Sequence, residues 1–413
     1  MNILMAHWAW YPSGGDWTYI DSVCKVYESH GHAIIPFAMH HERNIPSKYE
    51  KYFINKIDYK KINEGKSIQA GIQVLRRSIY SLEAKRKLSS LLSDVHVDIG
   101  QLNSINNYQT PSIIPILKQR HIPVVWRILD YKLLCPNTTF VVNDALCEAC
   151  FKHKYYHCIL NRCKKNSYLA SSVAALESYT YYLLPYYKQV DLFLFQSEFT
   201  RDMFVKYGYD IKKTHIIENP YESKNIQPCY SGKNYILYFG RLEKVKGIYT
   251  LLEAMKMLPH VQLKIVGDGS EYQNIMRYIT NESLANVALV GPKWNNDLEP
   301  LVRDCEFVIV PSEWYEPSPY VVLQAFSFGK PVIASNMGGL KDVIRENENG
   351  MVFEAGNSNA LSAVIGKMLY DKNKIQRMGA AGRHLVETKH DPERYYTDTV
   401  SLFTNLITGR THA

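Results

Sequence analysis

A glycine-bounded run with two cations follows an apolar segment in the second half of the chain. It extends from Gly240 to Gly247 and contains Arg241 and Lys246, and we expect a strand over 235–239 before it and a helix after it. The first amides of a helix, together with its dipole, favour phosphate oxygens. Arg241 can hold two such oxygens with its planar guanidinium, and Lys246 adds a second charge. The run predicts an anion site, with a solvated basic turn as the alternative.

A second stretch combines a carboxylate with a helix start. The apolar residues 307–310 predict a buried strand that ends at Pro311, and the loop after it presents Glu316. Pro319 is placed to open a helix that runs through Phe328. Free amides at that helix start suit phosphate, and the Glu316 carboxylate suits hydroxyl groups. The pairing predicts a site for a sugar joined to a diphosphate, because the two cations stand at an equivalent strand end.

Two further glycine-containing loops follow expected strands. Gly267 belongs to a Gly-Asp-Gly turn after 262–266, and Gly14-Gly15 follows the first strand of the chain. Glycine lets the backbone approach a ligand closely, so both loops are candidates for phosphate contact. An ordinary strand-to-helix turn is the alternative for each.

Short apolar strands alternate with helical segments along both halves of the chain. This alternation predicts an α/β protein made of two doubly wound domains with parallel sheets, which bind ligands at the carboxyl ends of their strands. The expected strands are 2–7, 33–39, 95–102, 124–129, 191–195 and 215–218 in the first half, and 235–239, 262–266, 287–290, 307–310, 331–334 and 350–353 in the second. We expect an N-terminal domain over 1–218, a linker over 219–234, a second domain over 235–390 and a C-terminal helix over 391–413 that packs back on the first domain.

Composition narrows the class of protein. The 413 residues are 46% hydrophobic and 21% charged, which is typical of a globular protein and excludes global disorder. No apolar run reaches the roughly 18–20 residues of a spanning helix, and the N-terminus does not resemble a signal peptide. A soluble cytoplasmic protein is therefore expected. The first 220 residues hold 27 Lys and Arg against 19 Asp and Glu, so the whole net charge of +8 lies there.

Five of the eight cysteines fall within an irregular segment, 131–166. A reducing compartment argues against disulfides there. The spacing of Cys147, Cys150, Cys158 and Cys163 is usable for a structural zinc ion, with Cys135 nearby. A set of buried free thiols is the alternative.

These motifs resemble those of the retaining glycosyltransferases of family 4, which have the two-domain GT-B fold. The second half matches at 240–247, 265–272, 311–335 and 336–344. The first half resembles a subgroup with a cysteine-containing insertion, which is here 131–166. Its matching pieces are the Gly14-Gly15 loop, 124–137, 147–150 and 195–204.

The resemblance implies a metal-independent transferase that uses a nucleotide sugar, UDP- or GDP-linked, and keeps the anomeric configuration. The implied catalytic residues are Arg241 and Lys246, on the diphosphate, and Glu316, on the sugar hydroxyls. The implied donor-binding residues are Gly14, Gly15, Gly240, Gly267, Ser318, Pro319, Tyr320 and Gln324. No cofactor is required, and the acceptor would be a glycan or a lipid-linked glycan of surface polysaccharide synthesis.

Two positions depart from the family pattern. Gln324 stands where a second Glu usually grips the ribose, and Leu129 stands where the subgroup usually has His before Asp130. Asp130 is left either as an acceptor-side residue or as a loop cap. These departures motivate an alternative, a non-catalytic relative that binds nucleotide or glycan and supports another enzyme.

Charge and aromatic residues raise the question of a membrane surface. Arg76, Arg77 and 85–87 lie on one expected amphipathic helical region, and 167–188 is rich in Tyr. Both features favour peripheral contact with an anionic leaflet, at the inner face of the plasma membrane, where a lipid-linked acceptor would sit. An ordinary solvated helix face is the alternative. Nucleic acid is not an expected partner, because the positive charges form no known nucleic-acid module.

Overall fold

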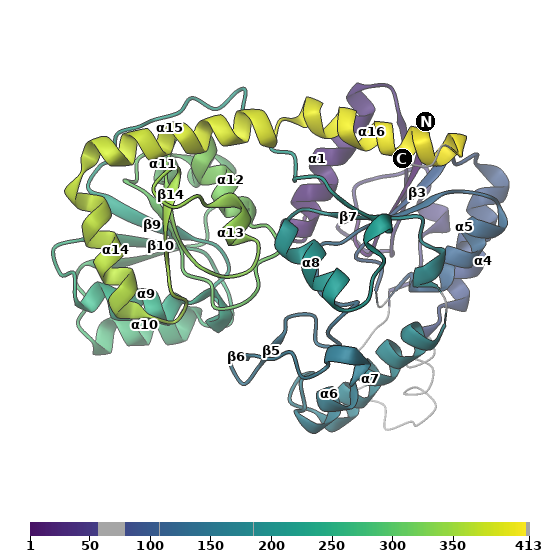
Figure 1. Cartoon of the computed structure of the whole chain (residues 1–413), viewed down its shortest axis with the longest axis horizontal. Helices are drawn as coiled ribbons and strands as arrows, with labels where there is room; N and C mark the ends of the chain where they lie inside the picture. The colour runs from purple at the N-terminus through teal and green to yellow at the C-terminus, as the bar shows by residue number, and fades with distance from the viewer. Residues whose placement is uncertain (57–78, 107, 185, 410–413) are drawn as a thin grey trace.

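The computed structural model describes residues 1–56, 79–106, 108–184 and 186–409. It contains two α/β domains side by side, each built around a sheet of six strands (Figure 1). Every strand pair in both sheets is parallel. The expected α/β fold with two doubly wound parallel sheets is therefore confirmed.

The N-terminal sheet places the first strand of the chain next to the second and third. In spatial order its strands are β2 (Ala33–Phe37), β1 (Asn2–His7), β3 (Ile99–Asn103), β4 (Val124–Arg127), β7 (Leu192–Phe195) and β8 (Thr214–Ile216). The described α-helices of this half are α1 (Gly15–Ser29), α4 (Leu82–Asp94), α5 (Ile114–Gln119), α6 (Tyr156–Leu160), α7 (Tyr168–Leu183) and α8 (Glu198–Lys206).

The second sheet repeats the same plan. Its strands, in spatial order, are β11 (Val287–Gly291), β10 (Gln262–Val266), β9 (Tyr235–Phe239), β12 (Val308–Val310), β13 (Val332–Ser335) and β14 (Gly350–Phe353). The helices after β9 are α9 (Ile248–Lys256), α10 (Tyr272–Asn281), α11 (Glu299–Arg303), α12 (Tyr320–Ser327), α13 (Leu340–Val343), α14 (Ser358–Tyr370), α15 (Lys372–Lys389) and α16 (Pro392–Thr408). A ligand site is expected where β9 and β12 end, because the chain leaves these neighbouring central strands toward opposite halves of the sheet.

Alternation along the strands divides each core into two layers. In β1, Leu4 packs in one hydrophobic cluster and Ile3 in another, on the opposite face of the sheet. In β9, Ile236 and Leu237 divide in the same way. Such strands are apolar on both faces because helices cover both sides of a parallel sheet. The sheets are thus rigid supports for the loops at their edges.

The last helix returns to the first domain. Figure 1 shows α16 crossing from the second domain to lie over α1. The hydroxyl groups of Tyr19 and Tyr395 are 2.6 Å apart, and Phe403 is buried in the same cluster as Tyr19. Arg127 holds the start of the expected linker, since its guanidinium donates to Asn219 Oδ1 at 2.6 Å. The exact domain boundaries stay a prediction.

Several expected elements differ in extent. The strand expected from residue 95 begins only at Ile99, because Asp98 is used to accept the Asn2 amide at 2.6 Å before the ladder starts. The segment 131–166 is mostly irregular, as expected, but contains the short ribbon β5–β6 (Val141–Val142 and Ala145–Leu146) and the helix α6.

The expected basic helix is described only in part. Arg76 and Arg77 lie outside the described residues, and α4 begins at Leu82. The apolar side of α4 packs against the core of the first domain, where Leu88 and Leu91 are fully buried. No helix among the described residues has the length and hydropathy to cross a membrane. Contact with an anionic membrane surface stays a prediction.

Candidate functional site

The loops that follow β9 and β12 meet through one ion pair. Lys246 Nζ lies 2.6 Å from Glu316 Oε1, and the two side chains are 17% and 5% exposed. Lys246 ends the short 3₁₀ helix Lys244–Lys246 before α9, and Glu316 precedes α12. The structure thus brings together the second predicted cation, the predicted carboxylate and the loop that opens α12.

Glycine at position 247 makes this approach geometrically feasible. Its φ of 70° is in the left-handed region, and a Cβ atom there would lie 1.8 Å from the carbonyl oxygen of Pro311. The Glu313 amide donates to the Val245 carbonyl at 2.8 Å across the same contact. The β9 loop therefore rests directly on the end of β12, which fixes Lys246 beside Glu316.

One oxygen of Glu316 is held by three donors. Lys246 Nζ, Ser312 Oγ at 2.6 Å and Trp314 Nε1 at 2.8 Å all reach Oε1. Within the described part of the chain, no hydrogen bond reaches Oε2. Burial pushes the pKa of Glu316 up, but Lys246 and the two hydrogen bonds outweigh burial and leave it below the ordinary value of 4.5. Glu316 is thus an ionised, fixed carboxylate with one oxygen left for a hydroxyl group.

A pair of glycines after β13 supports the same loop from behind. The Gly339 amide donates to the Glu316 carbonyl at 2.6 Å, and a Cβ atom on Gly338 would lie 2.5 Å from the Glu316 backbone. These glycines and the two side-chain donors Ser312 and Trp314 were not predicted as site residues. The sequence signal for the glycines is the Gly-Gly dipeptide, which is separated by three residues from the end of the expected strand 331–334.

Arg241 is near this site without contacting it. Its guanidinium is 65% exposed and pairs with Glu243 at 2.9 Å. The hydroxyl of Tyr238 donates to the Arg241 carbonyl at 2.8 Å. Burial raises the pKa of Tyr238, the negative charge of Glu316 adds to this rise, and the positive charge of Arg241 opposes it. Arg241 is therefore free to turn toward a ligand, but its predicted role on a diphosphate is an inference from position.

The predicted glycine loops fall into two kinds. A Cβ atom on Gly267 would lie 1.9 Å from the carbonyl oxygen of Gly240, so these two glycines let neighbouring loops pack on each other. A Cβ atom on Gly15 would meet nothing within 4 Å, although Gly15 is the first residue of α1. Glycine costs helix stability relative to alanine, and packing does not require it at this position. Gly15 therefore faces open space beside the start of α1 and suits a ligand. The backbone conformation of Gly14, with a φ of 136°, explains glycine there, and loop packing explains Gly240 and Gly267.

Carboxylates gather on the first-domain side of the site. Asp16 follows the Gly14-Gly15 loop and accepts from His7 Nε2 at 3.2 Å and Trp8 Nε1 at 3.0 Å. Burial raises the pKa of Asp130, and the negative charge of Asp16 adds to this rise. Asp130 also accepts the Lys132 amide at 2.8 Å, so it caps the turn after β4, the simpler of its two expected roles. An acceptor-side role for Asp130 stays a prediction.

The remaining donor-binding candidates surround the start of α12. Pro319 is the N-cap residue and Tyr320 the first helical residue, one position later than the sequence predicted for the proline. Ser318, Tyr320 and Gln324 are all half-buried. The first amides of an α-helix lack partners inside the helix, so this end of α12 can receive an anion.

The cysteine-containing segment reaches the second domain, which the sequence did not predict. Tyr315 Oη donates to Glu148 Oε1 at 2.9 Å, and Lys206 Nζ lies 2.6 Å from Glu148 Oε2. Lys244 Nζ lies 3.0 Å from Asp144 Oδ2. The segment therefore touches the residue before Glu316 and the loop that carries Lys246.

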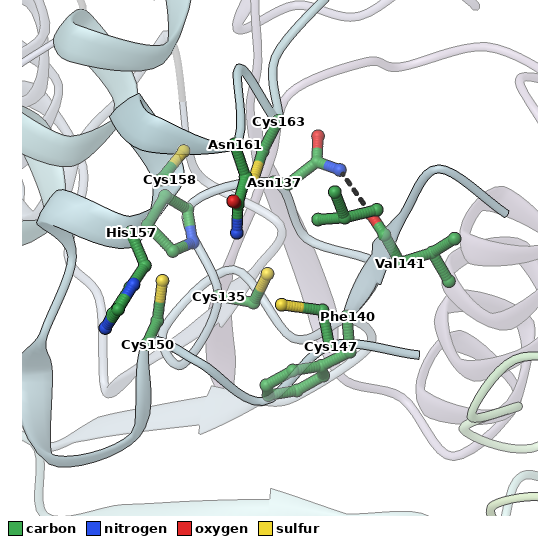
Figure 2. Close-up of a pocket in the computed structure, with 12 residues that line it drawn as sticks. Cys135, Asn137, Phe140, Val141, Cys147, Cys150, His157, Cys158, Asn161 and Cys163 are labelled. Atoms are coloured by element: carbon green, nitrogen blue, oxygen red, sulfur yellow. Dashed lines mark hydrogen bonds between the residues drawn. The ribbon is translucent and has the colours of Figure 1, made fainter. Parts of the chain in front are cut away.

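The four predicted zinc ligands lie close together, but their side chains do not point to one common centre. Cys147, Cys150, Cys158 and Cys163 line one small cavity, together with Cys135 (Figure 2). Among the described residues, no three His, Cys, Asp or Glu side chains are arranged to hold a metal ion. All eight cysteines of the chain are free thiols.

The lowered pKa of Glu316 predicts how stability depends on pH. The carboxylate is more acidic folded than unfolded, so its stabilising effect is present at neutral pH and is lost as the pH falls through and below about 4.5. In Lys246→Ala the cation is gone and burial dominates, so the pKa of Glu316 should be raised rather than lowered. Acidification should therefore reduce the difference in free energy of unfolding between this variant and the wild-type protein. Urea unfolding between about pH 7 and pH 4 measures both curves. Parallel curves for the two proteins would contradict this account of Glu316.

Comparison with known proteins gives a family match for residues of the second domain. Residues 221–385 match the family described as glycosyl transferases group 1. This part of the chain is therefore similar to group 1 glycosyltransferases. The lipopolysaccharide core biosynthesis glycosyltransferase LpsE of Rhizobium meliloti is 29% identical over 148 residues, which are 36% of this chain and 43% of that protein. The chain therefore spans less than half the length of this curated relative.

Solved structures resemble nearly the whole chain. Sucrose-phosphate synthase of Thermosynechococcus elongatus aligns over 99% of this chain and 100% of its own, with a TM-score of 0.71 and 18% identity. HepE of Anabaena in complex with UDP-glucose aligns over 98% and 100%, with a TM-score of 0.66 and 16% identity. At these identities the likeness shows the fold, which is GT-B, as expected. Membership of the subgroup with a cysteine-containing insertion stays a prediction.

Proposed function

We propose that this protein is a retaining glycosyltransferase that moves a sugar from a UDP- or GDP-sugar to a glycan or lipid-linked glycan acceptor. The observation that carries the proposal is the fixed Lys246–Glu316 pair at the start of α12. A cation and helix amides suit the diphosphate, and the free oxygen of Glu316 suits a hydroxyl of the sugar. The match of residues 221–385 to the group 1 family and the names of the relatives support the same class of reaction.

In the proposed mechanism the side chains of this chain stabilise charge rather than form bonds. Charge develops on the diphosphate as the sugar leaves, and Lys246 and Arg241 would neutralise it from the second domain. The acceptor hydroxyl would attack on the face from which the diphosphate departs, so the configuration is kept. The Gly14-Gly15 loop would approach the diphosphate from the first domain. We propose no metal ion in this reaction and assign the donor sugar as a hexose.

Arg241→Ala tests the proposal with little effect on folding, because the side chain is mostly exposed. We expect kcat to fall by about 10²–10³-fold, the size of effect seen when one hydrogen-bond donor to a transition state is removed. Arg303→Ala is the matched control, since Arg303 is also exposed and paired with a neighbouring carboxylate, Asp304. Transfer is measured with UDP- and GDP-sugars that raise the melting temperature of the wild-type protein. Equal kcat values in the two variants would remove Arg241 from the mechanism.

A non-catalytic role is the second candidate, and one observation favours it. Leu129, in place of the expected His, is packed against the apolar core of the first domain and offers no polar group to the site. A protein of this kind would be stabilised by a nucleotide sugar without consuming it. Turnover or hydrolysis of any stabilising donor would exclude this alternative.

A further inference from the structure

Five cysteines surround one cavity in the segment that the mechanism leaves unused. They come from the turn after β4, the stretch after β6, the helix α6 and the turn beyond it, and they are Cys135, Cys147, Cys150, Cys158 and Cys163. Figure 2 shows their side chains around a shared space. The cavity measures about 10 Å³, close to the volume that one water-sized sphere needs.

The backbone of this segment is held in an unfavourable conformation. Nine of the sixteen non-glycine residues with positive φ in the described chain lie between 138 and 166. Such conformations cost of order 1–3 kcal/mol each and persist only where the surroundings impose them. The segment has little regular structure to impose them, since its only strands are the two-residue β5 and β6.

The surroundings of the thiols carry positive charge. Lys164 directly follows Cys163 and is half-buried. Lys132 is itself buried and bonded to Glu177 at 2.7 Å. Lys132 is therefore already neutralised by Glu177. Four thiolates on a divalent cation would carry a net charge of about −2, which the nearby Lys164 would offset in part.

We propose that these cysteines bind one divalent cation of the zinc type, as four thiolates, and that the ion fixes the segment against the second domain. Each thiol that binds releases its proton to solvent, and no electrons are exchanged. The sulfur atoms do not converge on one centre in the structure, so metal binding requires the cysteine side chains to rotate into the cavity. A change between staggered χ1 rotamers allows this. Four of the five cysteines would bind the ion, and the fifth would lie beside the site without binding it.

The position of Glu148 connects the ion to the donor site. Glu148 stands between Cys147 and Cys150 and accepts from Tyr315, the residue before Glu316. An ion held by these cysteines would fix the carboxylate that orients Tyr315. This consequence rests on the proposed function, whereas metal binding does not, so the metal content of the purified protein tests the inference even if no transfer is found.

Zinc content is the decisive measurement. Full-length protein purified from zinc-supplemented medium without chelators should contain about one zinc per chain, by elemental analysis. Cys147→Ser combined with Cys163→Ser leaves three of the thiols and should lower the content at least tenfold. Cys229→Ser, a half-exposed cysteine outside the cluster, is the control and should keep it. Zinc-free wild-type protein, or full retention in the double variant, would overturn the proposal.

A second measurement covers the case in which the double variant does not fold. In native wild-type protein, about four thiols should become reactive to a thiol reagent only after a zinc chelator is added. Thiols that react equally with and without chelator would refute the site. A measured protein mass lower by two hydrogens, with Cys158 and Cys163 joined, would show a disulfide in place of a metal site and would also refute the proposal.

Discussion

Lys246→Ala should lower kcat for sugar transfer by about 10²–10³-fold, the size of effect seen when one hydrogen-bond donor to a transition state is removed. The proposed role of Lys246 is to neutralise the leaving diphosphate from a position fixed by Gly247 and by contact with Pro311. A flexible surface lysine has to be ordered before it can do this. Lys246 is already ordered by its 2.6 Å bond to Glu316.

The same substitution should also destabilise the fold. Removal of Lys246 leaves the charge of Glu316 buried with two neutral donors, and an unpaired buried charge costs about 3–5 kcal/mol. Lys256→Ala is the control, because Lys256 is paired with Glu253 and Glu282 at the surface, where such pairs contribute about 0–1 kcal/mol. Urea unfolding and steady-state kinetics are measured on each variant.

A double variant separates folding from chemistry. Lys246→Met combined with Glu316→Gln removes both charges and keeps side chains of similar size, so most of the lost stability should return. Activity should stay as low as in Lys246→Ala. Recovery of transfer together with stability would mean that Lys246 acts only by holding the loop.

The second domain could be predicted well because its signals are local. The strands at 235–239, 262–266 and 350–353 have the expected ends, since each is a short apolar run bounded by turn residues. That the cation loop and the carboxylate loop meet also follows from sequence, because the carboxyl ends of parallel strands share one edge of the sheet. Local periodicity was sufficient for both conclusions.

Contacts between distant segments were beyond reach of the sequence. Tyr315 and Glu148 are 167 positions apart, and nothing in either neighbourhood indicates that they touch. The anchoring of one Glu316 oxygen by Ser312 and Trp314 depends on side-chain rotamers and on the close approach of Gly338, which no pattern encodes. For Arg241 the sequence says more than the structure. Its residue type and spacing predict contact with a diphosphate, whereas its side chain in the structure pairs with Glu243.

Glu316→Gln should lower kcat/KM by roughly 10- to 150-fold, because a hydrogen bond to a charged group contributes about 1.5–3 kcal/mol. The amide oxygen of Gln can still take the place of Oε1 beneath Ser312 and Trp314, so the loop should keep its shape. The amide nitrogen then replaces Oε2, and an acceptor of hydroxyl groups becomes a donor. The loss should therefore fall on the contact to the sugar.

Deoxy analogues of the donor locate this contact. If Oε2 of Glu316 accepts one hydroxyl of the sugar, the donor that lacks this hydroxyl should react with the wild-type protein and with Glu316→Gln at nearly equal kcat/KM. Donors that lack another hydroxyl should keep the full difference between the two proteins. This coupling isolates one bond, because a general loss of loop structure would lower kcat/KM for every donor by the same factor. A uniform loss across the series would assign Glu316 to holding Lys246 in place, and the sugar would then be held by other residues around α12.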